Sequence, residues 1–268
     1  MRRLAWTWPA LLLPALLADA GWSAAVLDEA EALRIGQAAI GRQLEDHVLR
    51  DTSARAVALS DFRGKPLLIN FVYTSCSSVC PTIVQTLDAA VGAAREALGD
   101  DSFAVVTVGF DTRNDTPERM RAFARAQGID RPGWQFLSGD AGTVAALAEQ
   151  VGFVVYPAPQ GFDHMALTTV VDQEGRIYRQ IYGGVFEAPA VVEPLKDLVF
   201  GRRSDWTSLE GLVNRVRLFC TLYDARTGAY RFDYSPFITL AIGLVALAGV
   251  GGFAVREWRR AGPWRPRT

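Results

Sequence analysis

The chain has few of the side chains that hold small exported scaffolds together or bind polyanions. It contains only three cysteines and two histidines in 268 residues. Three cysteines are too few for a disulfide-dense scaffold, and a chain of this length can bury a core without such bonds. The net charge is −1, and no basic stripe or acidic block interrupts the sequence. These absences exclude a nucleic-acid partner and a charged disordered tail.

Charged residues are also missing from a stretch near the N-terminus. Arg2 and Arg3 precede an apolar run over residues 4–17, which ends near Ala18-Asp19-Ala20. A basic start, a short apolar run and a small-residue site are typical of a secretory signal. We therefore expect a signal peptide over residues 1–20, with an uncleaved N-terminal anchor as the alternative.

A second uncharged stretch lies near the C-terminus. Residues 236–255, "PFITLAIGLVALAGVGGFAV", contain no charge, and aromatic residues lie on both sides. Twenty helical residues span ~30 Å, the thickness of the bilayer hydrocarbon. Five arginines follow in residues 256–268, which predicts a cytoplasmic tail. We expect a bacterial inner-membrane protein whose functional domain faces the periplasm.

Between these ends, the hydrophobic pattern predicts an α/β domain. We expect a helical lead-in over 21–45, the domain over 46–201 and a juxtamembrane extension over 202–235. Apolar strand patterns and amphipathic helix patterns follow one another in the order β-α-β-α-(β)-α-β-β-α. Such an order indicates a mixed sheet covered on both faces. It is the order of a thioredoxin-like sheet, whose active cysteines lie where the first central strand runs into a helix.

Cys76 and Cys80, in "YTSCSSVCP", occupy that junction. Pro81 suits the first turn of a helix, so we expect Cys80 at the helix N-terminus, where the dipole lowers the pKa of a thiol. The pair could form a structural disulfide, exchange electrons or bind a metal. A disulfide across so short a loop gains little entropy, which argues against a purely structural role.

His164 precedes the strand expected over 166–171, whose start faces the cysteine loop in a thioredoxin-like sheet. Two thiolates and one imidazole suit Cu(I), with room for Cu(II) and a further ligand. Structural zinc needs a fourth protein ligand, and the sequence offers none. Asp163 could orient the His164 imidazole as a hydrogen-bond partner outside the set of ligands. A lone histidine is more often structural, so this prediction depends on the paired thiols.

Other candidate residues have simpler interpretations. Cys220 is expected to be a buried small hydrophobe, with a resolving thiol or an extra copper ligand as the alternative. His47 is expected at the surface before the first strand. Asp111 and Asp115 follow the strand expected over 103–110, so their loop should border the site while serving turns and caps.

Four segments resemble the Sco/SenC family of copper proteins. "YTSCSSVCP" is similar to its T-x-C-x-x-x-C-P motif, and "GFDHMALTTVVDQEGRIYRQIYG" to its D-H-x followed by a hairpin. "VGFDTRNDTPERMRAFA" and "FRGKPLLINFVYT" match two further family segments, so the resemblance covers about residues 45–200. It implies a thioredoxin fold and copper ligation by Cys76, Cys80 and His164. It also implies copper delivery to, or thiol reduction in, the CuA site of cytochrome c oxidase.

The departures from the family pattern do not touch the expected ligands. Arg113-Asn114 replace the family's proline and the residue after it, and residues 51–56 lack its usual glycine. The expected anchor is C-terminal, whereas the family's usual anchor is N-terminal. "RLFCTLYDARTGAYRFDY" resembles an extension of tail-anchored members.

The sequence therefore predicts a copper metallochaperone rather than a classical enzyme. Its partner would be the CuA-bearing subunit of cytochrome c oxidase or another copper or thiol protein. The alternative is a periplasmic thiol–disulfide oxidoreductase that reduces the cysteine pair of a copper-site protein. A thiol peroxidase is disfavoured, because Tyr73 occupies the threonine position of the P-x-x-x-T-x-x-C pattern. His164 separates the first two functions, since disulfide exchange does not need it.

Overall fold

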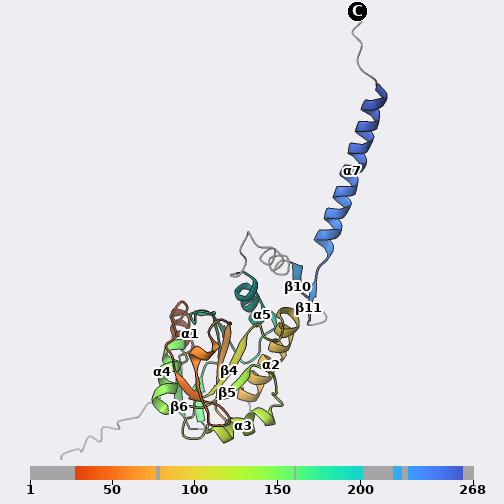
Figure 1. Cartoon of the computed structure of the whole chain (residues 1–268). Coiled ribbons are helices and arrows are strands. Elements are labelled where there is room, and N and C mark those ends of the chain that lie inside the picture. The colour runs from red at the N-terminus through yellow and green to blue at the C-terminus, as the bar shows by residue number, and fades with distance from the viewer. Residues whose placement is uncertain (1–27, 77–78, 160, 202–219, 225–228, 262–268) are drawn as a thin grey trace, which may run out of the picture.

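The computed structural model describes residues 28–76, 79–159, 161–201, 220–224 and 229–261 (Figure 1). The expected signal peptide or N-terminal anchor, much of the juxtamembrane extension and the end of the basic tail lie outside these residues. The helical and turn elements of the main domain are α1 (Glu29–Ala38), η1 (Leu59–Phe62), α2 (Val79–Leu98), α3 (Pro117–Ala126), α4 (Ala141–Val151), α5 (Pro189–Lys196) and η2 (Asp197–Gly201). Its strands are β1 (Val48–Arg50), β2 (Ala56–Ala58), β3 (Leu67–Val72), β4 (Ala104–Gly109), β5 (Trp134–Leu137), β6 (Val155–Ala158), β7 (Gly161–His164), β8 (Leu167–Val171) and β9 (Ile177–Tyr182).

A five-stranded mixed sheet forms the centre of the domain, in the order β5-β4-β3-β8-β9. β3 pairs parallel with β4 and antiparallel with β8, and β4 pairs parallel with β5. Every residue of β3 and β4 is buried, because helices cover both faces of these central strands. The predicted fold class, a thioredoxin-like mixed sheet flanked by helices, is confirmed.

The two faces of the sheet carry separate hydrophobic cores. On one face, Leu68 and Val105 pack with residues of α2, α3 and α5. On the other, Ile69 and Val106 pack with residues of α4. Figure 1 shows α1 and α4 on one side of the domain and α2 and α5 on the other. Alternate residues of each strand therefore serve opposite cores, as the period of two requires.

Several features of the fold differ from the sequence prediction. α1 is shorter than the helical lead-in expected over residues 21–45, and the sequence prediction did not include the hairpins β1–β2 and β6–β7. Strands this short contain too few residues to display a period of two.

His47 was expected at the surface, but it is buried and its Nε2 lies 3.1 Å from Oε1 of Gln150 on α4. That contact joins residues about a hundred positions apart, so local sequence does not reveal it.

Near the C-terminus, strands β10 (Thr221–Asp224) and β11 (Ala229–Phe232) form a hairpin that is joined to α5. Lys196 is only 5% exposed, and its Nζ donates to the Thr221 carbonyl at 2.7 Å. The Tyr230 hydroxyl donates to Glu193 at 2.9 Å, and burial together with Glu193 raises the pKa of Tyr230. Cys220 is buried, as expected. This part of the juxtamembrane extension is therefore attached to the domain by one buried and one partly buried polar contact.

Replacing Lys196 by methionine should release this hairpin. The apolar stem is kept, but the Thr221 carbonyl loses its donor, which costs about 1–3 kcal/mol for a buried polar group. We expect iodoacetamide to alkylate Cys220 several-fold faster in the variant, as followed by mass spectrometry. Lys65→Met is the control, because Lys65 is exposed and pairs only with the exposed Asp101. Cys220 alkylation at the parent rate would show that Lys196 does not hold the hairpin.

The last described element is the long helix α7 (Ser235–Ala261). Within its segment Ser235–Arg260, an 18-residue window has a mean hydropathy of 2.3 and no part buried against the rest of the protein. By length and composition, it can cross a membrane. Figure 1 shows it extending away from the domain. The orientation of this helix in a membrane remains a prediction.

Candidate functional site

The two cysteines lie at the junction of β3 and α2, as the sequence predicted. Cys80 is the second residue of α2, and its backbone N–H donates to the Cys76 sulfur at 3.3 Å. No disulfide joins the two cysteines in this structure. Because the N–H comes from the first turn of a helix, this contact favours negative charge on the Cys76 sulfur. The half-buried Cys76 is therefore the sulfur that the helix activates.

The prediction of a lowered Cys80 pKa is wrong. The Cys80 side chain is fully buried in the core under α2. Burial raises the pKa of the Cys80 thiol to about 12, and the neighbouring Cys76 sulfur adds to this effect. The helix N-terminus is directed at Cys76 instead, because a side chain on the core face of α2 cannot also lie beyond the end of the helix. The two thiols are thus chemically unequal.

Asp115 holds the cysteine loop in place from the neighbouring strand-to-helix loop. It is 2% exposed, and its Oδ1 accepts from the Thr74 N–H at 2.8 Å and the Thr74 hydroxyl at 2.7 Å. Its Oδ2 accepts from the Asp111 N–H at 2.9 Å. Burial nevertheless raises the pKa of Asp115. The expected border between this loop and the site is confirmed, and Thr116 is the N-cap of α3.

His164 lies at the end of β7, in a pocket of aromatic rings. Its ring centroid is 5.3 Å from that of Phe110, 5.4 Å from Phe153 and 6.2 Å from Tyr73. Burial lowers the pKa of His164, whereas the Met165 backbone and the charge of the exposed Asp163 act in the opposite direction. The neutral imidazole is the form that binds a metal. Its Nδ1 is buried and meets no hydrogen-bond partner among the described residues.

Tyr73 lies between the cysteine loop and the β6–β7 hairpin. Burial and the Cys76 sulfur raise the pKa of Tyr73 to about 12, so the phenol stays neutral. A side chain at Gly161 would begin 3.1 Å from the Tyr73 hydroxyl oxygen, and Gly161 has a φ of +128°. Glycine therefore allows β7 to approach the phenol closely. Through Tyr73, the strand that bears His164 is packed next to the loop that bears Cys76.

The predicted ligands are not all gathered in this structure. Among the described residues, no three Cys, His, Asp or Glu side chains lie close enough together to hold one ion. Cys76 contacts Cys80 and Tyr73. The His164 ring contacts Tyr73. Two soft sulfurs and an unpartnered imidazole nitrogen nevertheless form the donor set that suits copper. The assignment of Cys76, Cys80 and His164 as ligands stays a prediction.

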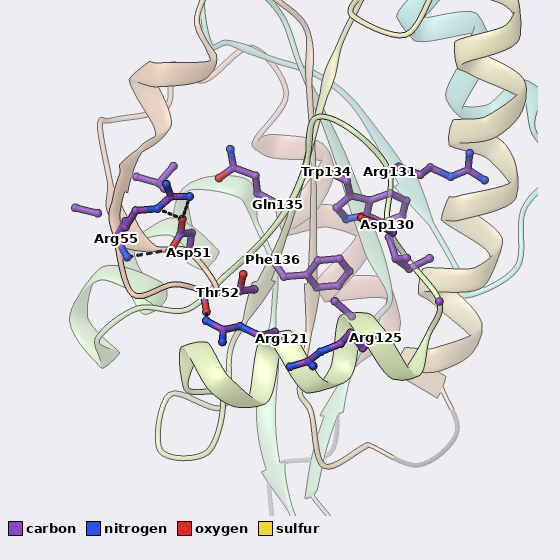
Figure 2. A pocket seen from close by; sticks show the side chains of 15 residues that line it. Asp51, Thr52, Arg55, Arg121, Arg125, Asp130, Arg131, Trp134, Gln135 and Phe136 are labelled. Atoms are coloured by element: carbon purple, nitrogen blue, oxygen red, sulfur yellow. Dashed lines mark hydrogen bonds and ion pairs between the residues drawn. The ribbon is translucent and has the colours of Figure 1, made fainter.

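A large surface cavity lies away from the cysteines. It has a volume of about 910 Å³ and follows the outer edge of β5 (Figure 2). A smaller cavity of about 460 Å³ is lined by Thr74 and Cys76 on one side and by Arg119 and Phe123 of α3 on the other. The candidate site is identified by its reactive groups and not by the volume of its cavity. A partner protein must reach the sulfur of a cysteine, and this does not require an enclosed cavity. Cys76 opens onto this smaller groove.

Comparison with known proteins agrees with this geometry. The family model described as SCO1/SenC matches residues 37–199, which include both cysteines and His164. The chain belongs to the SCO1/SenC family. This SCO1/SenC chain is 23% identical over 153 residues to the SCO1 protein homolog of Bacillus subtilis (strain 168), covering 55% of this chain and 77% of the relative.

Two solved structures resemble this SCO1/SenC domain. The putative electron transfer protein of Aquifex aeolicus VF5 is 27% identical with a TM-score of 0.54, covering 59% of this chain and 92% of that one. Bradyrhizobium japonicum ScoI, solved with copper bound, is 25% identical with a TM-score of 0.51, covering 59% of this chain and 99% of that one.

Proposed function

We propose that the chain is a copper-binding thiol protein that acts in the assembly of cytochrome c oxidase. Its cargo is copper, which Cys76, Cys80 and His164 hold for delivery to the CuA centre. Membership of the SCO1/SenC family supports this function, as does the bound copper of the related ScoI. The partner is then the CuA-bearing subunit or another copper or thiol protein.

One observation supports copper binding above the others. The buried Nδ1 of His164 has no hydrogen-bond partner among the described residues, although its ring lies beside Tyr73, which also contacts Cys76. A buried polar nitrogen without a partner is costly, and a metal ion is one group that would satisfy it. Disulfide exchange alone would leave this nitrogen without a role.

The unequal environments of the cysteines favour a second function, reduction of a disulfide in a copper-site protein. The half-buried Cys76 thiolate would attack the partner's disulfide, forming a mixed disulfide and releasing one partner thiolate. Cys80, on losing its proton, would then attack the Cys76 sulfur and release the second partner thiolate. Two electrons pass to the partner, and the Cys76–Cys80 disulfide is the oxidised product.

Anaerobic copper titration of the reduced full chain in detergent tests the proposal. We expect one copper per chain, with a thiolate-to-Cu(II) charge-transfer band in the absorption spectrum. Both should be lost in a Cys76→Ser, Cys80→Ser double variant and kept in Cys220→Ser, which removes a thiol buried elsewhere. Copper binding by the parent no stronger than by the double variant would reject the metallochaperone and favour the reductase.

We also propose that α7 anchors the chain in the bacterial inner membrane, with the domain on the periplasmic side. The apolar length of α7 and the arginines at its C-terminal end support this orientation. An oxidising compartment is also where a reversible cysteine pair is useful.

A further inference from the structure

The outer edge of the central sheet is open at β5. β5 is the last strand of the sheet and pairs only with β4 inside it. The Val105 N–H donates to the Gly133 carbonyl, so the polar groups of Gly133, Gln135 and Leu137 face β4. Because successive residues of a strand alternate, the N–H and C=O of Phe136 face outward, into the large cavity.

The chain begins a sixth strand beside β5 and then turns away. Arg50 at the end of β1 exchanges both backbone hydrogen bonds with Ser138 in an antiparallel bridge. At Asp51 the backbone leaves this line, because the Asp51 carboxylate accepts from the N–H groups of Ser53 and Arg55 and fixes a tight turn. Beyond Ser138, no strand of the described chain pairs with the outer edge of β5.

The unpaired edge of β5 is rigid. The buried rings of Trp134 and Phe136 stack with centroids 5.9 Å apart, and the Trp134 Nε1–H donates to the Thr107 hydroxyl at 2.9 Å. On the other face, the side-chain oxygen of Gln135 is buried without a partner among the described residues. A backbone held this firmly loses little entropy when a further strand pairs with it.

Arginines surround the edge on both sides. Arg121 and Arg125 of α3, Arg55 of the β1–β2 turn and Arg131 all line the cavity, against only Asp51 and Asp130 (Figure 2). Arg55 is neutralised by Asp51, and Arg131 by Asp88. Arg125 is exposed and makes no ion pair with any described residue. The charge available to a ligand is therefore positive and lies on the α3 side.

We propose that this groove binds an extended acidic segment of a partner protein, which adds antiparallel to β5 in line with β1. The segment exchanges backbone hydrogen bonds with Phe136. In an antiparallel pair, the residue that bonds to Phe136 has its side chain on the same face as Phe136. That is the face of α3, so these positions are the acidic ones. The groove shares no lining residue with the cavity at Cys76, and the proposal does not depend on copper.

A synthetic peptide tests the groove. The probe is a fluorescein-labelled octapeptide of alternating glutamate and valine, added to the full chain in detergent at low salt and followed by fluorescence anisotropy. We expect saturable binding that weakens as salt is added, because exposed charges are screened. N-methylation of the glutamates should abolish binding, since their N–H groups face β5. N-methylation of the same number of valines should leave binding intact, because the valine N–H groups face away from β5.

Variants of the chain test the charge. Arg125→Glu should weaken peptide binding about fivefold to tenfold, because that fold-change corresponds to the free energy that an exposed ion pair contributes. Arg179→Glu is the matched control, because Arg179 lies on β9 at the opposite edge of the same sheet. This variant should change the affinity for the peptide less than about twofold. Unchanged copper binding by both variants verifies that they fold.

Four results would overturn the proposal. The first two are no saturable binding of the probe, and equal binding of a peptide of alternating lysine and valine. The other two are an equal loss of binding on N-methylation of the glutamates and of the valines, and a loss of binding on N-methylation of the valines alone. Self-association of the parent that Arg125→Glu abolishes would also overturn it, because the groove would then hold a second copy of the chain.

Discussion

Replacing His164 by alanine is expected to weaken Cu(II) binding at least about 100-fold, because loss even of a residue that only supports a ligand costs up to that much. The two thiols can still hold Cu(I) as a two-coordinate ion, so Cu(I) affinity should fall less. The Cys76–Cys80 pair should stay oxidisable, since His164 belongs to a different hairpin. Competition titrations with a chromophoric chelator would measure both affinities, and thiol counts would follow the disulfide.

His47→Gln is the control for that experiment. His47 contacts Gln150 on α4, and glutamine keeps a donor for that contact. We expect parent affinity for both copper ions in this variant. A His164→Ala chain that binds Cu(II) as tightly as the parent would mean that the imidazole is not a ligand, whatever the thiols do.

Replacing Asp115 by alanine is expected to lower the free energy of unfolding by about 3 kcal/mol, because one buried donor and two partly buried donors lose their acceptor. Two of the donors belong to Thr74, so the cysteine loop should also loosen. Chemical denaturation would measure the stability, and a several-fold faster alkylation of Cys76 would report the loop. Asp111→Ala is the control, because among the described residues the Asp111 side chain accepts a hydrogen bond from Asn114 alone. An equal effect of both variants would contradict the anchoring role of Asp115.

The raised pKa of Asp115 adds a dependence on pH. Above the ordinary value of 3.8, the unfolded chain releases this proton while the folded chain keeps it up to its higher pKa. Folding therefore takes up a proton in that window, and the contribution of Asp115 to stability falls as pH rises through it. Asp115→Asn cannot titrate, so the parent should lose stability relative to this variant as pH is raised from 3.8. A constant difference would show that the pKa is not raised.

The sequence by itself determined the order of the main strands and helices, because their signals are local. α4 begins and ends at local signals: the Asp140 carboxylate accepts from the Thr143 N–H at its start, and Gly152 adopts a φ of +74° at its end. Pro117 follows the N-cap Thr116 of α3 in the same way. Periodicity and caps involve residues within four positions of each other, so they can be read without the fold.

The place of the cysteine pair also followed from the sequence, since the element order puts residues 76–80 between a buried central strand and a helix. Which thiol is activated did not follow. That depends on whether a side chain points into the core or toward the helix end, which differs between Cys76 and Cys80 although they are four residues apart.

Only the tertiary structure decided the surroundings of the site. Thr74 is bound by Asp115 from 41 residues away, and His164 is surrounded by Phe110, Phe153 and Tyr73 from three different segments. The open edge of β5 is likewise a property of the assembled sheet. Burial and hydrogen-bond partners of this kind arise when distant segments pack together, and no local pattern of residues encodes them.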